Sequence, residues 1–447
     1  MTLLQGVVVI GALAMGARAG GVGIGMWAGT GVFILVFVLR TAPGTPPVDA
    51  VLILLAVVLA ASVLQAAGGL DWMVGLAARA LRRRPDHITY VAPLVTWVLG
   101  FSAGTGNVIY PVLPIIFDVA YQHRIRPSRP LTMSVVAIVL SLVCSPVSAA
   151  TAALLSLVGS QGPGVDLADV LKITIPSVLF GIVVGSTVVN RLGADLDDDP
   201  DYLRQLEAGT VPPSDAPADP TDHAPDTNGS APGSPTAVAL FVCGLVTIVG
   251  LGLFPGLRPT IHSGSETDAL AMPLVIPMVM FATCAAMVVL CRPDLSEVPD
   301  LSVFRAGMTS AFALFGVAWL ADTFIRAHQD DIVVAIRGWV VAQPWVFVVA
   351  VFVVAALTLS QSTTVRVVVP IGLAMGLSPA LIVGSLPAVG GAVVLAGATG
   401  QAVAAVNFDR SGTTSLGAML VDNSFVVPAV ATVLPAVCCG FVLSHLV

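Results

Sequence analysis

Charged residues are scarce in this sequence. They make up 10% of its 447 residues, whereas soluble globular proteins contain about 25%. Hydrophobic residues make up 56%, and the mean hydropathy is +0.96. Apolar stretches of about 20 residues recur along the chain, and each is long enough to span the hydrocarbon core of a bilayer. The composition therefore excludes a soluble globular protein and indicates an all-α polytopic membrane protein.

Residue types that carry catalysis or bind metals are also few. The six cysteines have no C-x-x-C spacing, and the six histidines are scattered without the spacing of metal ligands. The sequence contains no G-x-x-x-x-G-K-[ST] loop and no G-x-S-x-G motif. We therefore expect no enzyme, no metal site, no cofactor and no nucleic-acid partner. A coupling ion, sodium or a proton, stays open, because backbone carbonyls at broken helices can bind one.

Much of the net charge of −7 comes from the part of the chain that contains residues 193–235. This segment is rich in Asp, Pro, Gly and Ser, and it cannot bury enough apolar surface to fold alone. We predict a disordered, acidic cytoplasmic linker. It separates an N-terminal half, residues 1–192, from a C-terminal half, residues 236–447.

Two arginine clusters set the predicted topology. They lie at 79–84 and 124–129, and they flank the apolar segment 88–118, which carries the polar interruption FSAGTGNVIYPVLP. A single crossing would place the clusters on opposite sides of the membrane, against the cytoplasmic preference of Lys and Arg in short loops. We therefore predict a re-entrant hairpin at 88–118 and a second one at 343–376. This threading places both termini outside.

The two halves share one pattern: three spans, a re-entrant hairpin, a broken span and a final span. Each half thus has about five transmembrane helices and one hairpin, and the halves have opposite orientations in the membrane. Inverted repeats with broken helices are typical of secondary transporters, which bind their substrate near the midplane. The predicted spans are 3–17, 20–39, 48–67, 130–158, 169–191, 236–254, 270–291, 304–322, 378–405 and 416–446.

The segment Thr358–Gly376 combines hydroxyl and amide side chains with one arginine, Arg366, inside nearly continuous hydrocarbon. A charge at membrane depth is expensive and marks a functional site by default. The alternative is that Arg366 lies near a helix end and extends its charged group to the lipid headgroups. The neighbouring Ser and Thr residues favour the functional interpretation, because such an extension would not require them.

Four interruptions are expected to converge: Ser102–Asn107, Ser145–Ser148, Ser360–Arg366 and Pro387–Thr399. Glycines, hydroxyls and free N–H groups at helix starts are suited to bind a small anion, and an arginine can bind a carboxylate with two parallel hydrogen bonds. The alternative for each residue is helix packing, where Ser, Thr and Gly are common. The candidate substrate-binding residues are Thr105, Gly106, Asn107, Ser145, Ser148, Ser362, Thr363, Thr364, Arg366, Gly390 and Gly391.

Four further ionisable residues have two interpretations each. Asp409 and Arg410, in NFDRSGTTSLG, could pair with each other or cap the last helix, or they could belong to a gate or an inner release path. Asp71 and Asp118 could relay protons, but they lie close to predicted membrane ends, where capping is the alternative.

Nearly the whole chain outside 193–235 resembles the bacterial anaerobic four-carbon dicarboxylate transporters, the Dcu family. The resemblance implies an inner-membrane carrier that exchanges (antiport) or takes up fumarate, succinate, malate or aspartate. By wider similarity to the ion-transporter superfamily it implies two hairpins per protomer, a homodimer and an elevator motion. The matching stretches are GARAGGVGIG, PGTPPVDAVLILLAVVLAASVLQAAGGLD, RRRPDHITYVAP, GTGNVIYPVLPIIFDVA, IRPSRP, SPVSAAT, ITIPS, VFRAGM, GVAWLADT and FDRSGTT.

The sequence departs from the family at two places that bear on the substrate. The second hairpin tip, SQSTTVR, replaces a plainer SQ followed by alanines. The segment before FDRSGTT reads VVLAGATGQAVAAVN, without the proline, tyrosine and acidic residues typical of the family. The resemblance therefore leaves an organic anion of another size open.

We expect a secondary carrier for a small organic anion, most simply a dicarboxylate, that works by alternating access. One alternative is a membrane-embedded sensor or regulatory subunit that binds the anion without transport and docks a partner through 193–235. Another alternative is an anion channel. The sequence leaves the coupling ion, exchange versus symport and the oligomeric state open.

Overall fold

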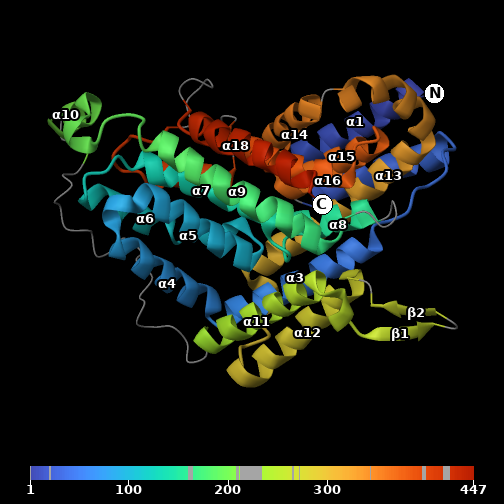
Figure 1. Ribbon diagram of the computed structural model, residues 1–447, viewed down its shortest axis with the longest axis horizontal. Helices are drawn as coiled ribbons and strands as arrows, with labels where there is room; N and C mark the ends of the chain where they lie inside the picture. Colours follow the sequence, from blue (N-terminus) through green and yellow to red (C-terminus); the bar gives the residue numbers. More distant parts are fainter. Residues whose placement is uncertain are drawn as a thin grey trace.

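The computed structural model describes residues 2–19, 22–159, 165–207, 211, 234–263, 266–270, 272–342, 344–394, 399–415 and 423–446. These residues form a helical bundle with one short antiparallel β-hairpin that projects from it, β1 (Thr260–Ser263) and β2 (Glu266–Ala269) (Figure 1). The helices up to the linker are α1 (Thr2–Ala19), α2 (Gly23–Phe33), α3 (Val48–Ala66), α4 (Gly69–Arg83), α5 (Ile88–Ala103), α6 (Leu113–Gln122), α7 (Ser128–Cys144), α8 (Ala149–Gly159), α9 (Leu167–Val189) and α10 (Pro200–Glu207). The later helices are α11 (Ser234–Leu253), α12 (Met272–Cys291), α13 (Ser302–Ala342), α14 (Pro344–Thr358), α15 (Gln361–Ala374), α16 (Pro379–Ser385), α17 (Gly400–Phe408) and α18 (Val426–Ser444).

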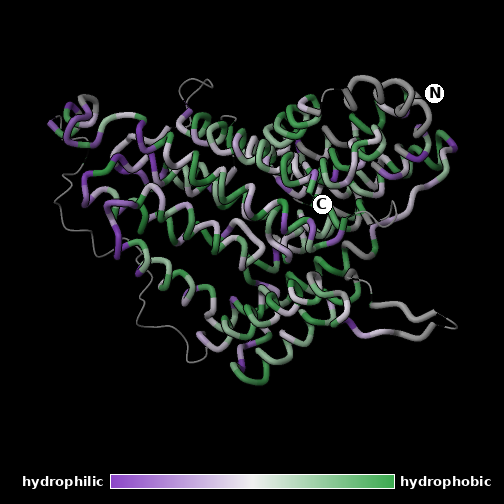
Figure 2. The backbone as a smooth tube through the Cα atoms, viewed as in Figure 1, coloured by the Kyte–Doolittle hydropathy of each residue, from purple (hydrophilic) through white to green (hydrophobic). Residues whose placement is uncertain are grey.

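Apolar length alone makes most of the long helices candidates for membrane crossing. In the described part of the chain, six helical segments are long and apolar enough, and a seventh results if the bent pair α3 and α4 is counted as one span. Figure 2 shows the same helices as mainly hydrophobic, with hydrophilic residues gathered at the end of the molecule around α10. The prediction of an all-helical multi-pass membrane protein is therefore confirmed, apart from the β-hairpin.

Both segments predicted as hairpins contain two helices that pack on each other. In residues 88–118, α5 and α6 are separated by a break that contains a short 3-10 helix, η3 (Gly106–Ile109). In residues 343–376, α14 and α15 are separated by Leu359 and Ser360, and residue 343 lies outside the described residues. The breaks fall where the polar residues interrupt the apolar sequence.

Helix α7 forms the centre of the bundle, since nearly all of its residues are buried. It packs against α5 and α9, and through them the first half of the chain meets α18. A helix that is apolar on every side must be surrounded by protein or lipid, and here protein surrounds it. A second, smaller core joins α1, α2 and α13.

Helix packing follows the same scheme in the two halves of the chain. The first helix of each hairpin packs beside the broken span of its own half: α5 beside α7, and α14 beside the 3-10 helix η7 (Leu386–Val393) that continues α16. The second helix packs on both halves: α6 touches α7 of its own half and α17 of the other, and α15 touches α13 of its own half and α8 of the other. The last helices, α9 and α18, pack against each other along their length.

Three of the arginines at 79–84, Arg79, Arg82 and Arg83, lie on a helix, and not in a simple connection after the span 48–67. Residues Gly69–Arg83 form α4, which is bent by 72° from α3. Its apolar residues Met73, Val74 and Leu81 are buried, and arginines Arg82 and Arg83 occupy its last turn, where they interact favourably with the helix dipole. Asp71 is exposed in the first turn of α4, which fits the capping alternative.

The first part of the predicted disordered linker is structured. Residues 196–198 form a 3-10 helix, η4 (Leu196–Asp198), and α10 follows. Leu196 and Tyr202 are 1% and 4% exposed, so both belong to the core. The prediction of disorder is therefore wrong for these residues, because it judged the segment without its arginine partners. Residues 208–210 and 212–233 of the linker lie outside the described residues.

A close contact between two glycines offers a test of the packing of α16 on α18. A Cβ at Gly384 would lie 2.6 Å from the carbonyl oxygen of Gly440. We expect Gly384→Ala to lower stability by about 1–3 kcal/mol, because the two backbones must separate. Thermal unfolding of the purified protein measures the change. The control is Gly250→Ala, because a Cβ at Gly250 meets no atom within 4 Å; there alanine should be neutral or stabilising, and equal effects of both changes would contradict the expectation.

Candidate functional site

The tip of the first hairpin is held in a defined conformation by its own residues. Helix α5 ends at Gly104, whose φ of +65° is a left-handed conformation that favours glycine. A Cβ there would also lie 2.6 Å from the carbonyl oxygen of Val147. Thr105 then caps η3, since its hydroxyl accepts a hydrogen bond from the N–H of Asn107 at 3.3 Å. The tip therefore presents the start of a short helix, the arrangement that binds anions in many proteins.

The break between α7 and α8 is joined to this tip. The Ser145 hydroxyl donates to the carbonyl of Phe101 at 2.6 Å. Ser148 accepts from the N–H of Thr151 at 3.1 Å, and its hydroxyl donates to the carbonyl of Leu142. Both serines are buried and use their hydroxyls on the backbone. Their hydroxyls therefore hold the break in position.

The other half of the chain also reaches the first tip, at the start of α17. A Cβ at Gly106 would lie 2.9 Å from Nε2 of Gln401, and a Cβ at Gly400 would lie 2.6 Å from the Tyr110 hydroxyl. Thr399 caps α17 by accepting from the N–H of Ala402 at 3.4 Å. Gln401 and Tyr110 were missed in the sequence. Gln401 could have been singled out, because it is the one amide side chain in the apolar stretch VVLAGATGQAVAA.

The second hairpin tip uses its hydroxyls in the same way. Ser360 caps α15 by accepting from the N–H of Thr363 at 3.3 Å, and the Thr363 hydroxyl lies 3.0 Å from the Ser360 hydroxyl. The Thr364 hydroxyl donates to the Ser360 carbonyl at 2.7 Å, and it lies 2.9 Å from the Thr358 hydroxyl. Ser362 is half-buried, 3.5 Å from the Ser360 hydroxyl. These contacts stabilise the start of the helix that carries Arg366.

Arg366 is buried in the interior and is not fully hydrogen-bonded. Its exposure is 1%, and its Nε and Nη2 have no hydrogen-bond partner. No ion pair of Arg366 is found among the described residues. The alternative in which the charged group extends to the headgroups requires an accessible guanidinium, and the burial contradicts it. An unpaired buried charge is strongly unfavourable, so this guanidinium is suited to receive an anion.

The two glycines of η7 are packing positions. A Cβ at Gly390 would lie 2.5 Å from Cγ2 of Val433 on α18, and one at Gly391 would overlap the carbonyl oxygen of Phe352 on α14. These contacts fit the packing alternative, because they let α14 and α18 approach the broken span closely.

Asp409 and Arg410 have separate partners. The buried carboxylate of Asp409 accepts from the N–H of Ser411 at 2.9 Å and from the N–H of Thr414 at 2.7 Å, so it organises its own loop. Arg410 lies 3.6 Å from the carboxylate of Asp118 on α6 and over the Phe117 ring. These contacts differ from the two predicted ones, an ion pair between Asp409 and Arg410 and a cap on the last helix. Arg410 instead connects the loop to the first hairpin.

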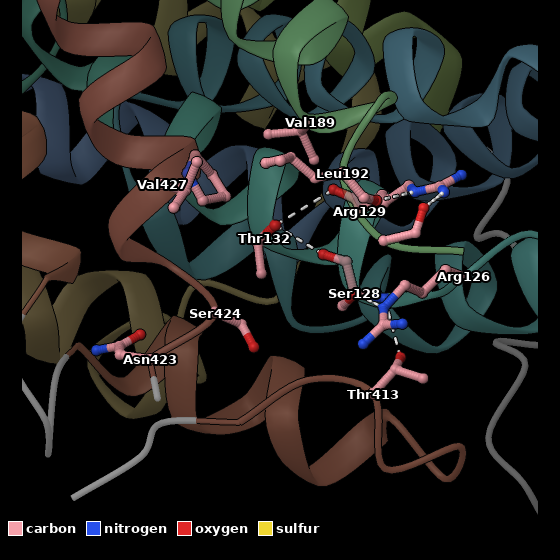
Figure 3. Close-up of a pocket in the computed structure, with 12 residues that line it drawn as sticks. Arg126, Ser128, Arg129, Thr132, Val189, Leu192, Thr413, Asn423, Ser424 and Val427 are labelled. Carbon is pink, nitrogen blue, oxygen red and sulfur yellow. Dashed lines mark hydrogen bonds between the residues drawn. The ribbon is translucent and has the colours of Figure 1, made fainter. Parts of the chain in front are cut away.

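Two cavities lie near these elements. The larger, about 270 Å³, is lined by Arg126, Ser128 and Thr132 of α7 and its preceding turn, by Thr413, and by Ser424 before α18 (Figure 3). It contains none of the candidate substrate-binding residues. The smaller, about 80 Å³, is lined by Gly104 and Thr105 of the first tip and by the apolar residues of α3. In the described part of the chain, no three His, Cys, Asp or Glu side chains lie close enough to hold a metal ion.

Apolar helices, two broken spans and a buried arginine beside them define a multi-pass membrane protein of the transporter class. The family model for the anaerobic C4-dicarboxylate membrane transporters matches residues 1–447. The chain therefore belongs to this family, as the resemblance predicted, and it is not an enzyme.

Individual relatives agree with this assignment. The anaerobic C4-dicarboxylate transporter DcuB of Escherichia coli O157:H7 is 36% identical over 442 residues, which cover 98% of this chain and 97% of the relative. The C4-dicarboxylate transporter DcuA of Escherichia coli K12 is 34% identical over 449 residues, 99% of each chain. The DcuA protein of Wolinella succinogenes is 32% identical over 446 residues, again 99% of each.

The hydrogen bond from Ser145 to Phe101 can be tested directly. We expect Ser145→Ala to cost about 1 kcal/mol or more, because a buried donor between two elements is lost. Hydrogen exchange at residues 104–109 should become faster at the same time. Thr187→Ala serves as the matched control, because the Thr187 hydroxyl bonds within its own helix at an exposed position and should change stability by less than about 0.5 kcal/mol. Unchanged exchange at the tip in Ser145→Ala would refute the role of this bond.

Proposed function

We propose that this protein is a secondary active transporter of four-carbon dicarboxylates, such as fumarate, succinate, malate and aspartate, in the bacterial inner membrane. The family assignment supports the substrate class, since each of the relatives named above is described as a C4-dicarboxylate transporter. The single observation that carries the site is the buried guanidinium of Arg366, whose Nε and Nη2 have no protein partner. A carboxylate is the natural partner of such a group.

The proposed binding site lies between the two hairpin tips and the two breaks. Thr105, Gly106 and Asn107 supply one side, and Ser362, Thr363 and Arg366 supply the other. Because most hydroxyls at the breaks cap helices, we infer that backbone N–H groups at the helix starts contact the substrate together with Arg366. Ser145, Ser148, Thr364, Gly390 and Gly391 hold these elements in place.

The packing scheme supports an inverted repeat as the basis of alternating access. In each half the first helix of the hairpin packs beside the broken span of that half, and the second helix reaches across to the other half, α6 to α17 and α15 to α8. In transporters with inverted repeats, the site lies where the repeats meet. The elevator motion, exchange of anions, a homodimer and outside termini are further parts of the proposal that rest on the resemblance. Asp409 and Arg410 belong to the inner path in this scheme, because Asp409 organises the loop after α17 and Arg410 ties that loop to α6.

A change of Arg366 to leucine separates a ligand-binding role from a structural one. A buried charge without a partner destabilises the empty protein, so Arg366→Leu should leave the melting temperature unchanged or raise it. The same change should abolish the stabilisation by succinate, because binding loses about 2–5 kcal/mol when one partner of a buried charge pair is removed. Thermal unfolding with and without succinate measures both effects, and uptake of labelled succinate into proteoliposomes measures transport.

Arg305→Leu is the matched control, because the Arg305 guanidinium is exposed and pairs with the exposed carboxylate of Asp300. It should retain the succinate effect and the uptake. A lower melting temperature of Arg366→Leu with unchanged succinate affinity would exclude Arg366 from the site. Binding of succinate without any flux in the wild type would favour the alternative of a sensor.

A further inference from the structure

The first part of the linker is bound to the rest of the chain by charge pairs. Asp195, Asp197 and Asp199 each contact a different arginine of the turn between α6 and α7 and the start of α7. The three pairs are Arg129 with Asp195 at 2.7 Å, Arg124 with Asp197 at 3.1 Å, and Arg126 with Asp199. A backbone hydrogen bond adds to these ion pairs, since the N–H of Leu196 donates to the carbonyl of Arg124 at 3.1 Å.

The same segment reaches the end of α6. The hydroxyls of Tyr121 on α6 and Tyr202 on α10 are 3.0 Å apart, and their rings meet edge to face. Leu196 is fully buried beside them in the main hydrophobic core. The segment therefore touches the second helix of the first hairpin, α6, as well as the turn that follows it. In Figure 1, α10 lies beyond the same end of the bundle as α6 and the start of α7.

The middle of α6 has a second attachment, the contact of Arg410 with Asp118 and Phe117. Most residues of α6 are buried, and the helix packs on α4, α5, α7 and α17, so the two polar attachments add to apolar packing that already holds it. One attachment comes from the loop that precedes the last helix, and the other comes from the acidic segment.

We propose that residues 195–207 form an electrostatic strap that holds α6, and with it the first hairpin, against α7. The strap is reversible, because the pair of Arg124 with Asp197 is exposed and Asp195 is exposed in its pair with Arg129, so salt and competing anions weaken these two pairs. The pair of Arg126 with Asp199 is largely buried and is screened less. Release of the strap frees the C-terminal end of α6, where Tyr121 lies, to move away from α7. This inference rests on the proposed function for its role in transport, but the strap itself is defined by structural contacts.

Hydrogen exchange of the purified protein in lipid nanodiscs tests the strap without any transport assay. In the triple variant Asp195→Asn, Asp197→Asn and Asp199→Asn, amide exchange in residues 195–207 and in residues 113–127 should become about tenfold faster or more, while exchange in α9 and α18 stays unchanged. Raising the salt concentration should have the same effect on the wild type and little effect on the variant. Tyr202→Phe, which removes one hydroxyl and keeps the ring, should accelerate exchange at α6 alone.

The control variant is Asp300→Asn, which removes an exposed ion pair with Arg305 elsewhere in the chain. It should leave exchange in both segments as in the wild type. Faster exchange in 195–207 with unchanged exchange in 113–127 would show a docked segment that holds nothing, and unchanged exchange in both would refute the docking. Both results are independent of whether wild-type protein transports succinate, so a failure of the strap and a failure of the proposed function can be told apart.

Discussion

Every break in a helix inside this bundle must satisfy its own backbone polar groups, because hydrocarbon offers no hydrogen bonds. The structure meets this constraint with hydroxyl side chains. Ser145 and Ser148 serve the break after α7, Ser360 serves the start of α15, and Thr399 serves the start of α17. The breaks are therefore stable without a ligand. Their polar residues are first of all structural, and this explains why such residues accompany every interruption.

Arg366 is the exception to this internal satisfaction. Its neighbours Thr363 and Thr364 bond to the preceding residues, whereas its Nε and Nη2 have no partner. Burying a charge in this way costs free energy that a tightly packed protein would avoid by substitution with an apolar residue. A ligand carboxylate that pairs with the guanidinium of Arg366 offsets that cost, so the burial of this charge favours ligand binding. The hydroxyls of Ser145 and Ser148 offer no such gain, because they already have partners.

The sequence predicts those features of the fold that depend on apolar length. Helices α9, α11 and α12 begin and end within two residues of the predicted spans, α18 ends within two residues of its span but begins at Val426 and not at 416, and both hairpin segments break at their polar residues. The partners of single side chains could not be predicted, because they depend on contacts between distant segments. The contact of Arg410 with Asp118 joins residues 292 positions apart (410 − 118), and the packing role of Gly391 depends on Phe352 across a helix interface. Gln401 and Tyr110 were missed for the same reason.

The arginines around residue 126 have two roles. In the predicted threading they mark the cytoplasmic side, because positive charge in short loops favours that side and acidic residues contribute little to the choice. After folding, Arg124, Arg126 and Arg129 pair with the acidic start of the linker. Composition alone predicted disorder for that segment, since it lacks apolar residues apart from a few such as Leu196. Charge complementarity supplies binding that the few apolar residues of the segment cannot supply alone, so the same arginines on which the predicted topology rests also order the segment that follows the first half of the chain.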